Sequence, residues 1–339
     1  MTTGEVVGDE INPHPGMLKV MIQLMKLRVI VLLQVTAICA ILVHDSLARY
    51  DLIQLERTWA DTVIACLVTV VGGTLSAGGS NSINMWYDAD IDPHMRRTQN
   101  RPIPQGHTTP RFALVFGTVI AILGSSVFFI LSWKAAFWSF FSVVFYVFIY
   151  SIWLKRRTPQ NIVIGGIAGA TPPLIGWAAA AGDSISSLNP LDLGSPIPWM
   201  LFFLIFLWTP PHFWALALYR SGEYGKVNIP MMNEVKGAEY TLTQSKIYCF
   251  LLLAMGAVPL FWPESGLPLL WAFVSVGLTL WYGKSVWDID PTEPFDENGR
   301  MPKAAKSFFR SLFYLGWMFL SLVLICFIPP TWLGFLGPL

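Results

Sequence analysis

The stretch NMWYDADIDPHMRRTQNRP, residues 84–102, places three aspartates and three arginines directly after a long apolar run. That run is about 20 residues, the length of helix that spans a bilayer. Charge is costly in hydrocarbon, so ionisable groups beside a membrane-length segment indicate a functional site. Carboxylates followed by guanidiniums suit a polyanion that arrives with a divalent cation. The pattern therefore predicts a site for a metal-bound diphosphate whose apolar tail lies in the bilayer.

The composition is that of a polytopic membrane protein. Of the 339 residues, 54% are apolar and only 13% are charged, against about 25% charged in soluble domains. The four cysteines stand singly, with no Cys-x-x-Cys or Cys/His spacing, so neither a metal site nor a disulfide framework is predicted. The polar segment 1–15 lacks the features of a cleavable signal or transit peptide, and we expect it to lie in water.

The hydropathy pattern predicts an all-α bundle of nine transmembrane helices, because backbone groups in lipid must be satisfied within the segment. The predicted spans are 27–44, 62–83, 112–132, 135–154, 162–181, 197–218, 247–262, 267–283 and 308–328. Gly- and Ala-rich stretches at 71–80 and 165–181 are expected to let helices approach closely. We expect a cytoplasmic tail over 1–26, one membrane domain over 27–330 and a C-terminal tail over 331–339.

Basic residues are concentrated on one side of the predicted bundle. All but three of the 22 Lys and Arg residues lie in the N-terminal tail or in the loops after the even-numbered spans; the exceptions are Arg49, Arg57 and Lys134. The positive-inside rule places these segments in the cytoplasm, or its organellar equivalent, and the C-terminus outside. We expect the membrane to be the inner membrane of a bacterial cell. The long polar loops fall on the same side, so the chemistry is expected at the cytoplasmic mouth.

Asn84, Asp88 and Asp92 are spaced i, i+4, i+8, which stacks such residues on one face of a helix. Two carboxylates and an amide oxygen predict a Mg²⁺ site, in which the ion keeps waters and is shared with substrate phosphates. Pro93 disfavours helical backbone at Asp92, so Asp92 either continues the helix or closes it. The alternative is a solvated helix end at which acids and bases pair with each other.

The spacing Asn84-x3-Asp88-x3-Asp92 resembles the first aspartate motif of the UbiA superfamily of intramembrane prenyltransferases. Three longer strings resemble the branch of that family that farnesylates haem b. They are NMWYDADIDPHMRRTQNRPIP at 84–104, LKRRTPQNIVIGGIAGATPPLIGW at 154–177, and TPPHFWALALYR with EYGKVNIPMM within 209–232. The second loop of this branch often carries two acids before the tyrosine. Here Gly222 and Glu223 stand there, so one carboxylate remains.

The resemblance implies Mg²⁺-dependent transfer of a farnesyl group from farnesyl diphosphate to a vinyl group of haem b, followed by water addition. Asn84, Asp88 and Asp92 would hold the metal, while Glu223 and Tyr224 would close over the substrates. The remaining candidates, for binding diphosphate or haem, are Arg96, Arg97, Arg101, Lys155, Arg156, Asn161, His212 and Arg220. Guanidinium groups match phosphate oxygens bidentately. The basic residues have an alternative role as lipid-headgroup anchors, and His212 as a satisfied residue beside a helix break.

Two other functions stay open. A prenyltransferase for an aromatic or quinone precursor would share the diphosphate half of the site. A transporter would carry charges within its spans, which here hold almost none. The expected partners are membrane lipid, haem b, farnesyl diphosphate and a downstream haem-modifying enzyme or terminal oxidase, and no nucleic-acid binding is expected.

Overall fold

The computed structural model describes residues 15–53, 55–220, 224–297, 300–334 and 337, and these residues contain helices but no strand. The long elements are α2 (Leu27–Arg49), α3 (Trp59–Tyr87), α4 (Pro110–Val127), α5 (Trp133–Val144) with the π-helix η3 (Phe145–Leu154), α6 (Asn161–Ala170) with α7 (Pro172–Ala181), α8 (Ile197–Tyr219), α10 (Ala238–Gly256), α12 (Leu269–Trp287) and α13 (Pro302–Cys326). Shorter helices are α1 (Met17–Met25), α9 (Met232–Lys236), α11 (Val258–Phe261) and α14 (Pro330–Leu333).

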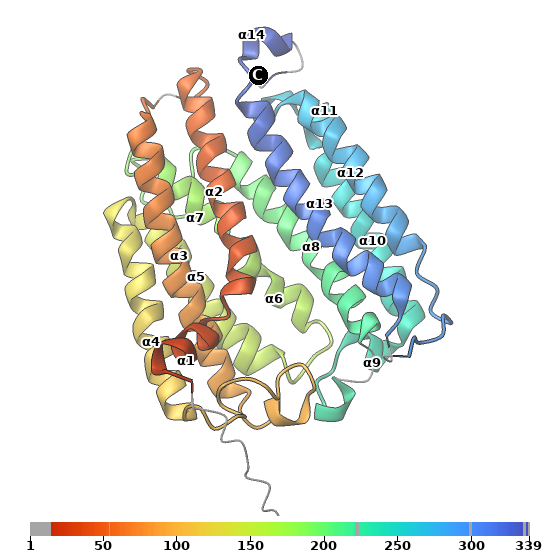
Figure 1. The fold of residues 1–339 in the computed structure, drawn as a ribbon. Helices are drawn as coiled ribbons and strands as arrows, with labels where there is room; N and C mark the ends of the chain where they lie inside the picture. Colours follow the sequence, from red (N-terminus) through yellow and green to blue (C-terminus); the bar gives the residue numbers. More distant parts are fainter. Residues whose placement is uncertain (1–14, 54, 221–223, 298–299, 335–336, 338–339) are drawn as a thin grey trace, which may run out of the picture.

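The long helices run side by side as a bundle (Figure 1). At one end lie α1, α9 and the loop that follows α3, while α14 and the C-terminus lie at the other end. Consecutive helices alternate in direction, so the loops after α3, η3, α8 and α12 meet at the same end as α1. The segments rich in acids and bases are thereby gathered at one mouth of the bundle.

Within the described residues, eight helices are long and apolar enough to cross a membrane. The ninth predicted span, 247–262, falls on α10 and α11. Helix α10 starts earlier, at Ala238, and its polar first half, AEYTLTQSK, lowers its mean hydropathy. It nevertheless packs between α8 and α12. The prediction of an all-α bundle of membrane helices is confirmed.

Helices α3 and α4 pack closely because glycines face each other along their contact. A Cβ atom at Gly79 would lie 2.4 Å from the carbonyl oxygen of Gly117, and one at Gly124 would lie 2.4 Å from the backbone nitrogen of Ser76. Helix pairs in membranes depend on such small residues, since lipid supplies little hydrophobic drive between helices. The predicted close packing of the Gly-rich stretch 71–80 is confirmed, and it fixes where α3 ends.

The predicted tail, 1–26, includes the helix α1, which packs on the bundle. Its buried residues Val20 and Leu24 form a small apolar cluster with Met85 of α3 and Ala113 of α4. The exposed apolar residues of α1, such as Leu18, lie on its other side. The domain boundaries themselves stay a prediction.

Candidate active site

The end of α3 brings the three predicted metal ligands together. Helix α3 stops at Tyr87, and the N–H of Asp88 donates to Asn84 O at 3.0 Å. The N–H of Asp92 donates to Asp88 O at 2.9 Å, and Asp92 opens a short 3-10 helix whose second residue is Pro93. Asp92 therefore neither continues nor closes α3: Asp88 caps that helix, and Asp92 starts the next short helix, in whose first turn a proline fits. Asn84, Asp88 and Asp92 are 5%, 1% and 2% exposed.

Each of these three side chains is held by a basic side chain from another part of the chain. Lys155 Nζ donates to Asp88 Oδ2. Arg101 Nη1 donates to both carboxylate oxygens of Asp92, at 2.8 and 2.7 Å. Lys26 Nζ donates to Asn84 Oδ1 at 3.3 Å. The acids and bases pair with each other as the alternative interpretation expected, but they do so in a buried cluster and not at a solvated helix end.

Asp88 has one carboxylate oxygen that remains open to a cation. Its Oδ1 is buried and accepts no hydrogen bond among the described residues; Arg156 Nη2 lies 3.8 Å away. Leaving a charged oxygen buried and unsatisfied costs about 1–3 kcal/mol or more. No group of three or more His, Cys, Asp and Glu side chains in the described residues could hold a metal ion. The donor set is two carboxylates and an amide, which fits Mg²⁺ with waters and phosphate oxygens completing its shell.

The cluster carries excess positive charge that burial makes costly. Burial, together with repulsion from Arg101 and Lys155, holds the pKa of Lys26 well below its usual value. Burial also lowers the pKa of Lys155, against the attraction of Asp88. Burial raises the pKa of Asp92 although Arg101 pulls it down. Three cations surround two carboxylates in this poorly hydrated cluster, so its charge is net positive. Binding of a polyanion would neutralise that charge and is therefore favoured.

Arg156 lies at the rim of the cluster, with Asp90. Its guanidinium donates to both oxygens of Asp90 at 2.7 Å and to Tyr87 O at 2.9 Å, and it lies 4.6 Å from the centre of the Tyr87 ring. Asp90 is exposed, and the hydrogen bonds from Arg156 lower its pKa. Asp90 is thus exposed to solvent, whereas Asp88 and Asp92 are buried.

The π-helix η3 places Lys155, a predicted binding residue, but the π-helix itself is not predicted from the sequence. The N–H of Lys155 donates to Tyr150 O at 2.9 Å, five residues back. One turn earlier on the same element, Ser151 Oγ accepts from Asn84 Nδ2 at 3.1 Å. Such segments often mark functional sites. The run FYVFIYSIWL is almost uniformly apolar and gives no signal of the change in hydrogen-bond spacing.

Lys26 is a site residue that the sequence does not predict, since there it is only one of the basic residues of the N-terminal tail. It joins α1 to α2 in a left-handed conformation, with φ 54°, which is uncommon outside glycine and asparagine. The corner is held by α3: Asn81 Nδ2 donates to Met25 O at 3.0 Å, and Gly78 leaves room for the Met25 side chain. No glycine or proline marks this break in the sequence.

Asn161 and Tyr224 lie where two loops approach the cluster. Asn161 is buried, and its Nδ2 donates to Thr158 O at 2.8 Å, with longer contacts to Lys155 O at 3.3 Å and Pro230 O at 3.4 Å. It therefore joins the loop after η3 to the loop after α8. Tyr224 is half-buried, and the Arg97 guanidinium lies 6.0 Å from its ring centre.

Two more predicted residues, Arg96 and Arg220, are not brought into the cluster. Arg96 is exposed. The Arg220 guanidinium is half-buried and lies 5.5 Å from the Tyr219 ring centre. Glu223 lies outside the described residues.

His212 is packed in the bundle, between α8 and α13. Its ring stacks on Trp208 at 4.2 Å and on Phe308 at 4.8 Å between centroids, and its Nδ1 is 2.5 Å from Ser311 Oγ. These contacts satisfy the histidine within the bundle. Its predicted role facing haem stays a prediction.

Comparison with known proteins agrees with this geometry. The model of the UbiA prenyltransferase family matches residues 53–323. A protoheme IX farnesyltransferase from Parvibaculum lavamentivorans is 44% identical over 269 residues, which cover 78% of this chain and 77% of the relative. Another, from Bartonella henselae, is 39% identical over 324 residues, which cover 94% of this chain and 93% of the relative.

Solved structures share the fold at low sequence identity. A structure of a digeranylgeranylglyceryl phosphate synthase aligns with a TM-score of 0.67 at 14% identity, over 91% of this chain and 98% of the other. A UbiA homolog from Archaeoglobus fulgidus, bound to DMAPP and Mg²⁺, aligns with a TM-score of 0.57 at 13% identity, over 89% of this chain and 98% of the other. Together with the family match over most of the sequence, this shows that the chain belongs to the UbiA prenyltransferase family.

Proposed function

We propose that this membrane protein transfers a farnesyl group from farnesyl diphosphate to a vinyl group of haem b, with addition of water, giving haem O and diphosphate. The observation that carries the proposal is the buried cluster at the end of α3, in which Lys155 binds Asp88, Arg101 binds Asp92 and Lys26 binds Asn84. The name and the high coverage of the bacterial relatives support haem b as the acceptor.

We assign Asn84, Asp88 and Asp92 to a Mg²⁺ ion. When bound, such an ion neutralises charge that develops on the leaving diphosphate. The open Oδ1 of Asp88 is the first site for a cation, because no protein donor competes for it among the described residues. The UbiA homolog solved with DMAPP and Mg²⁺ supports this pairing of ion and substrate class.

Arg101, Lys155 and Lys26 then bind the diphosphate. Each holds a carboxylate or amide oxygen in the structure described above. When a metal ion satisfies those oxygens, the three cations are released toward phosphate oxygens, where charge-assisted hydrogen bonds are strong. Preorganised donors of this kind stabilise a leaving group without reorganising water.

The loops around the cluster position the substrates. Arg156 and Arg97 lie at the mouth, where they meet the outer phosphate or a haem propionate, and Tyr224 with Glu223 closes over them. Asn161 keeps the two loops in register through its contacts with Lys155 O and Pro230 O. We place this mouth in the cytoplasm and the chain in the bacterial inner membrane, and we expect a downstream haem-modifying enzyme or terminal oxidase to receive the product.

The test is turnover by the purified protein in detergent with haem b, farnesyl diphosphate and Mg²⁺, followed by mass spectrometry of the haem. We expect hydroxyethylfarnesyl haem from the wild type and at least a hundredfold less from an Asp88→Asn, Asp92→Asn variant, because both carboxylates act on the leaving group. Asp90→Asn is the matched control. It changes an exposed acid of the same motif, and we expect activity within about threefold of wild type.

The outcomes separate substrate from site. Diphosphate release with a quinone-type aromatic acceptor, and no haem product, would move the chain to another branch of the family. Full activity in the double variant would leave the substrate assignment standing and refute the metal site.

A further inference from the structure

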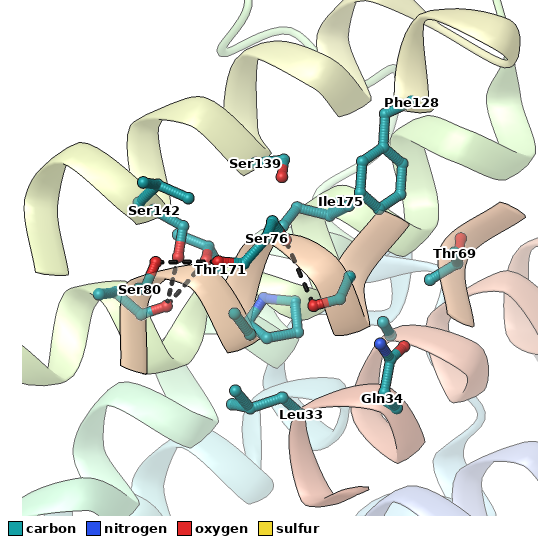
Figure 2. Close-up of a pocket in the computed structure, with 16 residues that line it drawn as sticks. Leu33, Gln34, Thr69, Ser76, Ser80, Phe128, Ser139, Ser142, Thr171 and Ile175 are labelled. Atoms are coloured by element: carbon teal, nitrogen blue, oxygen red, sulfur yellow. Dashed lines mark hydrogen bonds between the residues drawn. The ribbon is translucent and has the colours of Figure 1, made fainter. Parts of the chain in front are cut away.

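A cavity with several hydroxyl groups in a mainly apolar lining lies deeper in the bundle than the acidic cluster, between α2, α3, α5 and the α6–α7 pair (Figure 2). Its volume is about 60 Å³. A single buried water needs about 10–15 Å³ by that measure, so several waters fit. Alongside apolar residues the lining carries a set of polar side chains, namely Gln34, Thr69, Ser76, Ser80, Ser139, Ser142 and Thr171.

The hydroxyl protons on one side of this cavity are already committed. Ser80 Oγ donates to Ser76 O at 3.0 Å, Ser142 Oγ to Ala168 O at 3.1 Å and Thr171 Oγ1 to Ala168 O at 2.8 Å (Figure 2). A hydroxyl whose proton is bound to a carbonyl has only its lone pairs left to offer. This wall of the cavity therefore presents hydrogen-bond acceptors.

The opposite side holds a polar group without a partner. Thr69 is 1% exposed, and its Oγ1 has no hydrogen-bond partner among the described residues. Buried hydroxyls are rarely left unsatisfied, and such groups often indicate an ordered water. Gln34, the neighbouring lining residue, donates through its Nε2 to Val70 O and to Thr74 Oγ1.

The cavity lies on the same face of α3 as the candidate metal ligands. Ser76, Ser80, Asn84 and Asp88 follow one another at intervals of four residues, a spacing that sets successive side chains about 6 Å apart on one stripe. Ser76 and Ser80, which line the cavity, therefore precede the candidate metal ligands by one to three helical turns. We expect the reacting carbon of a substrate whose diphosphate is held at Asn84 and Asp88 to lie on the cavity side of these ligands.

We propose that this cavity holds the water that adds to the cation in the last step of the reaction; the proposal rests on the function given above. A nucleophilic water needs its protons bound by acceptors and one lone pair directed at the electrophile. Serine and threonine oxygens whose own protons point to carbonyls provide those acceptors, and Thr69 supplies a further anchor. Water can form hydrogen bonds with these hydroxyl oxygens, whereas an isoprenoid chain cannot.

In this reaction the allylic C–O bond of farnesyl diphosphate breaks, and the farnesyl C1 bonds to the terminal vinyl carbon of haem b. Positive charge is then left on the internal vinyl carbon. The water oxygen donates an electron pair to that carbon and forms the new C–O bond. One water proton leaves to the released diphosphate. Without a positioned water the same cation loses a carbon-bound proton and becomes an alkene, which is lighter than the alcohol by one water.

The ratio of alcohol to alkene in the haem product tests the proposal. In a Ser76→Ala, Ser80→Ala variant we expect this ratio to fall about five- to tenfold, the effect of losing a hydrogen bond to a reacting group, while total farnesylated haem stays within about threefold. Ser82→Ala is the matched control. Ser82 is also a buried serine of α3, but its Oγ donates to Ala113 O at 2.7 Å on the α4 side. Thr69→Val is a second, nearly isosteric variant that should lower the ratio in the same direction.

Each outcome has one meaning. A wild-type ratio in both cavity variants, with farnesylation intact, would overturn the proposal. So would loss of all farnesylated haem from a cavity variant that still elutes as a single species, because the cavity would then serve the farnesyl step. No farnesylated haem from the wild type would instead refute the proposed function itself.

Discussion

Removing Arg101 from the cluster should make metal binding less dependent on diphosphate. In the structure, Arg101 donates to both oxygens of Asp92 at 2.8 and 2.7 Å, and the carboxylate is 2% exposed. A metal ion that binds alone must displace this guanidinium. When metal and diphosphate bind together, the displaced Arg101 guanidinium can bind the diphosphate instead of Asp92. Binding of the two should therefore be strongly synergistic.

The magnitude follows from the bonds that must be broken. Hydrogen bonds to a charged group contribute about 1.5–3 kcal/mol, and each 1.4 kcal/mol is about tenfold in a dissociation constant. Arg101 is mostly buried, with 16% of its side chain exposed, so solvent screening reduces this only moderately. We expect Arg101→Gln to tighten binding of the metal alone by about tenfold. In the same variant, the factor by which diphosphate tightens metal binding should be about tenfold smaller than in the wild type.

The assay is a titration of the purified protein in detergent with Mn²⁺, a spectroscopic substitute for Mg²⁺, with and without inorganic diphosphate. Free Mn²⁺ is read by electron paramagnetic resonance, so the result does not depend on turnover. Arg111→Gln is the matched control, because Arg111 is an exposed basic residue at the start of α4. Weaker binding of Mn²⁺ alone in Arg101→Gln, or no effect of diphosphate on the wild type, would refute the exchange of partners.

Three further outcomes are expected. Lys26→Met should lower kcat/KM for farnesyl diphosphate by about 10- to 100-fold, because one charge-assisted hydrogen bond is lost. Lys19→Met, at an exposed position on α1, should not change kcat/KM. Equal kinetics in the two variants would show that Lys26 does not bind the substrate. Gly79→Val should lower the Tm in detergent, because its Cβ would lie 2.4 Å from Gly117 O and overpacking costs about 1–3 kcal/mol. Gly277 has open space around it, so Gly277→Ala should change the Tm by no more than about a degree or two. Excess EDTA should abolish transfer without changing the elution volume, and Mg²⁺ should restore it; activity that persists in EDTA would argue against a metal at Asp88.

Local sequence patterns were sufficient to predict the membrane helices and the first residues of the candidate site. The length of each apolar run predicts a helix because lipid offers no other partner for the backbone. The four-residue spacing predicts that Asn84 and Asp88 share a face of α3, and Pro93 explains why the helix does not continue through Asp92. The span at 247–262 was predicted too late in the sequence, because the polar start of α10 has no hydropathy signal.

The partners of these residues depend on the packing of distant segments. Lys155 reaches Asp88 because η3 shifts its hydrogen bonds to five-residue spacing, a change that an apolar run does not encode locally. Lys26 reaches Asn84 because Asn81 and Gly78 hold an unusual backbone corner against α3. Both effects arise from contacts between elements and not from the propensity of either element.

By itself, the sequence determined a helical membrane protein with a metal-type carboxylate motif beside one of its spans, since hydropathy and residue spacing act over a few turns of one helix. Only the tertiary structure decided that each predicted metal ligand is held by its own cation, and that a cavity with hydroxyl groups in its lining lies further along α3. Arg101 reaches Asp92 within one loop, but Lys26 and Asn84, and Lys155 and Asp88, are more than 50 residues apart. Contacts between such distant segments depend on how the helices pack, which no local pattern specifies.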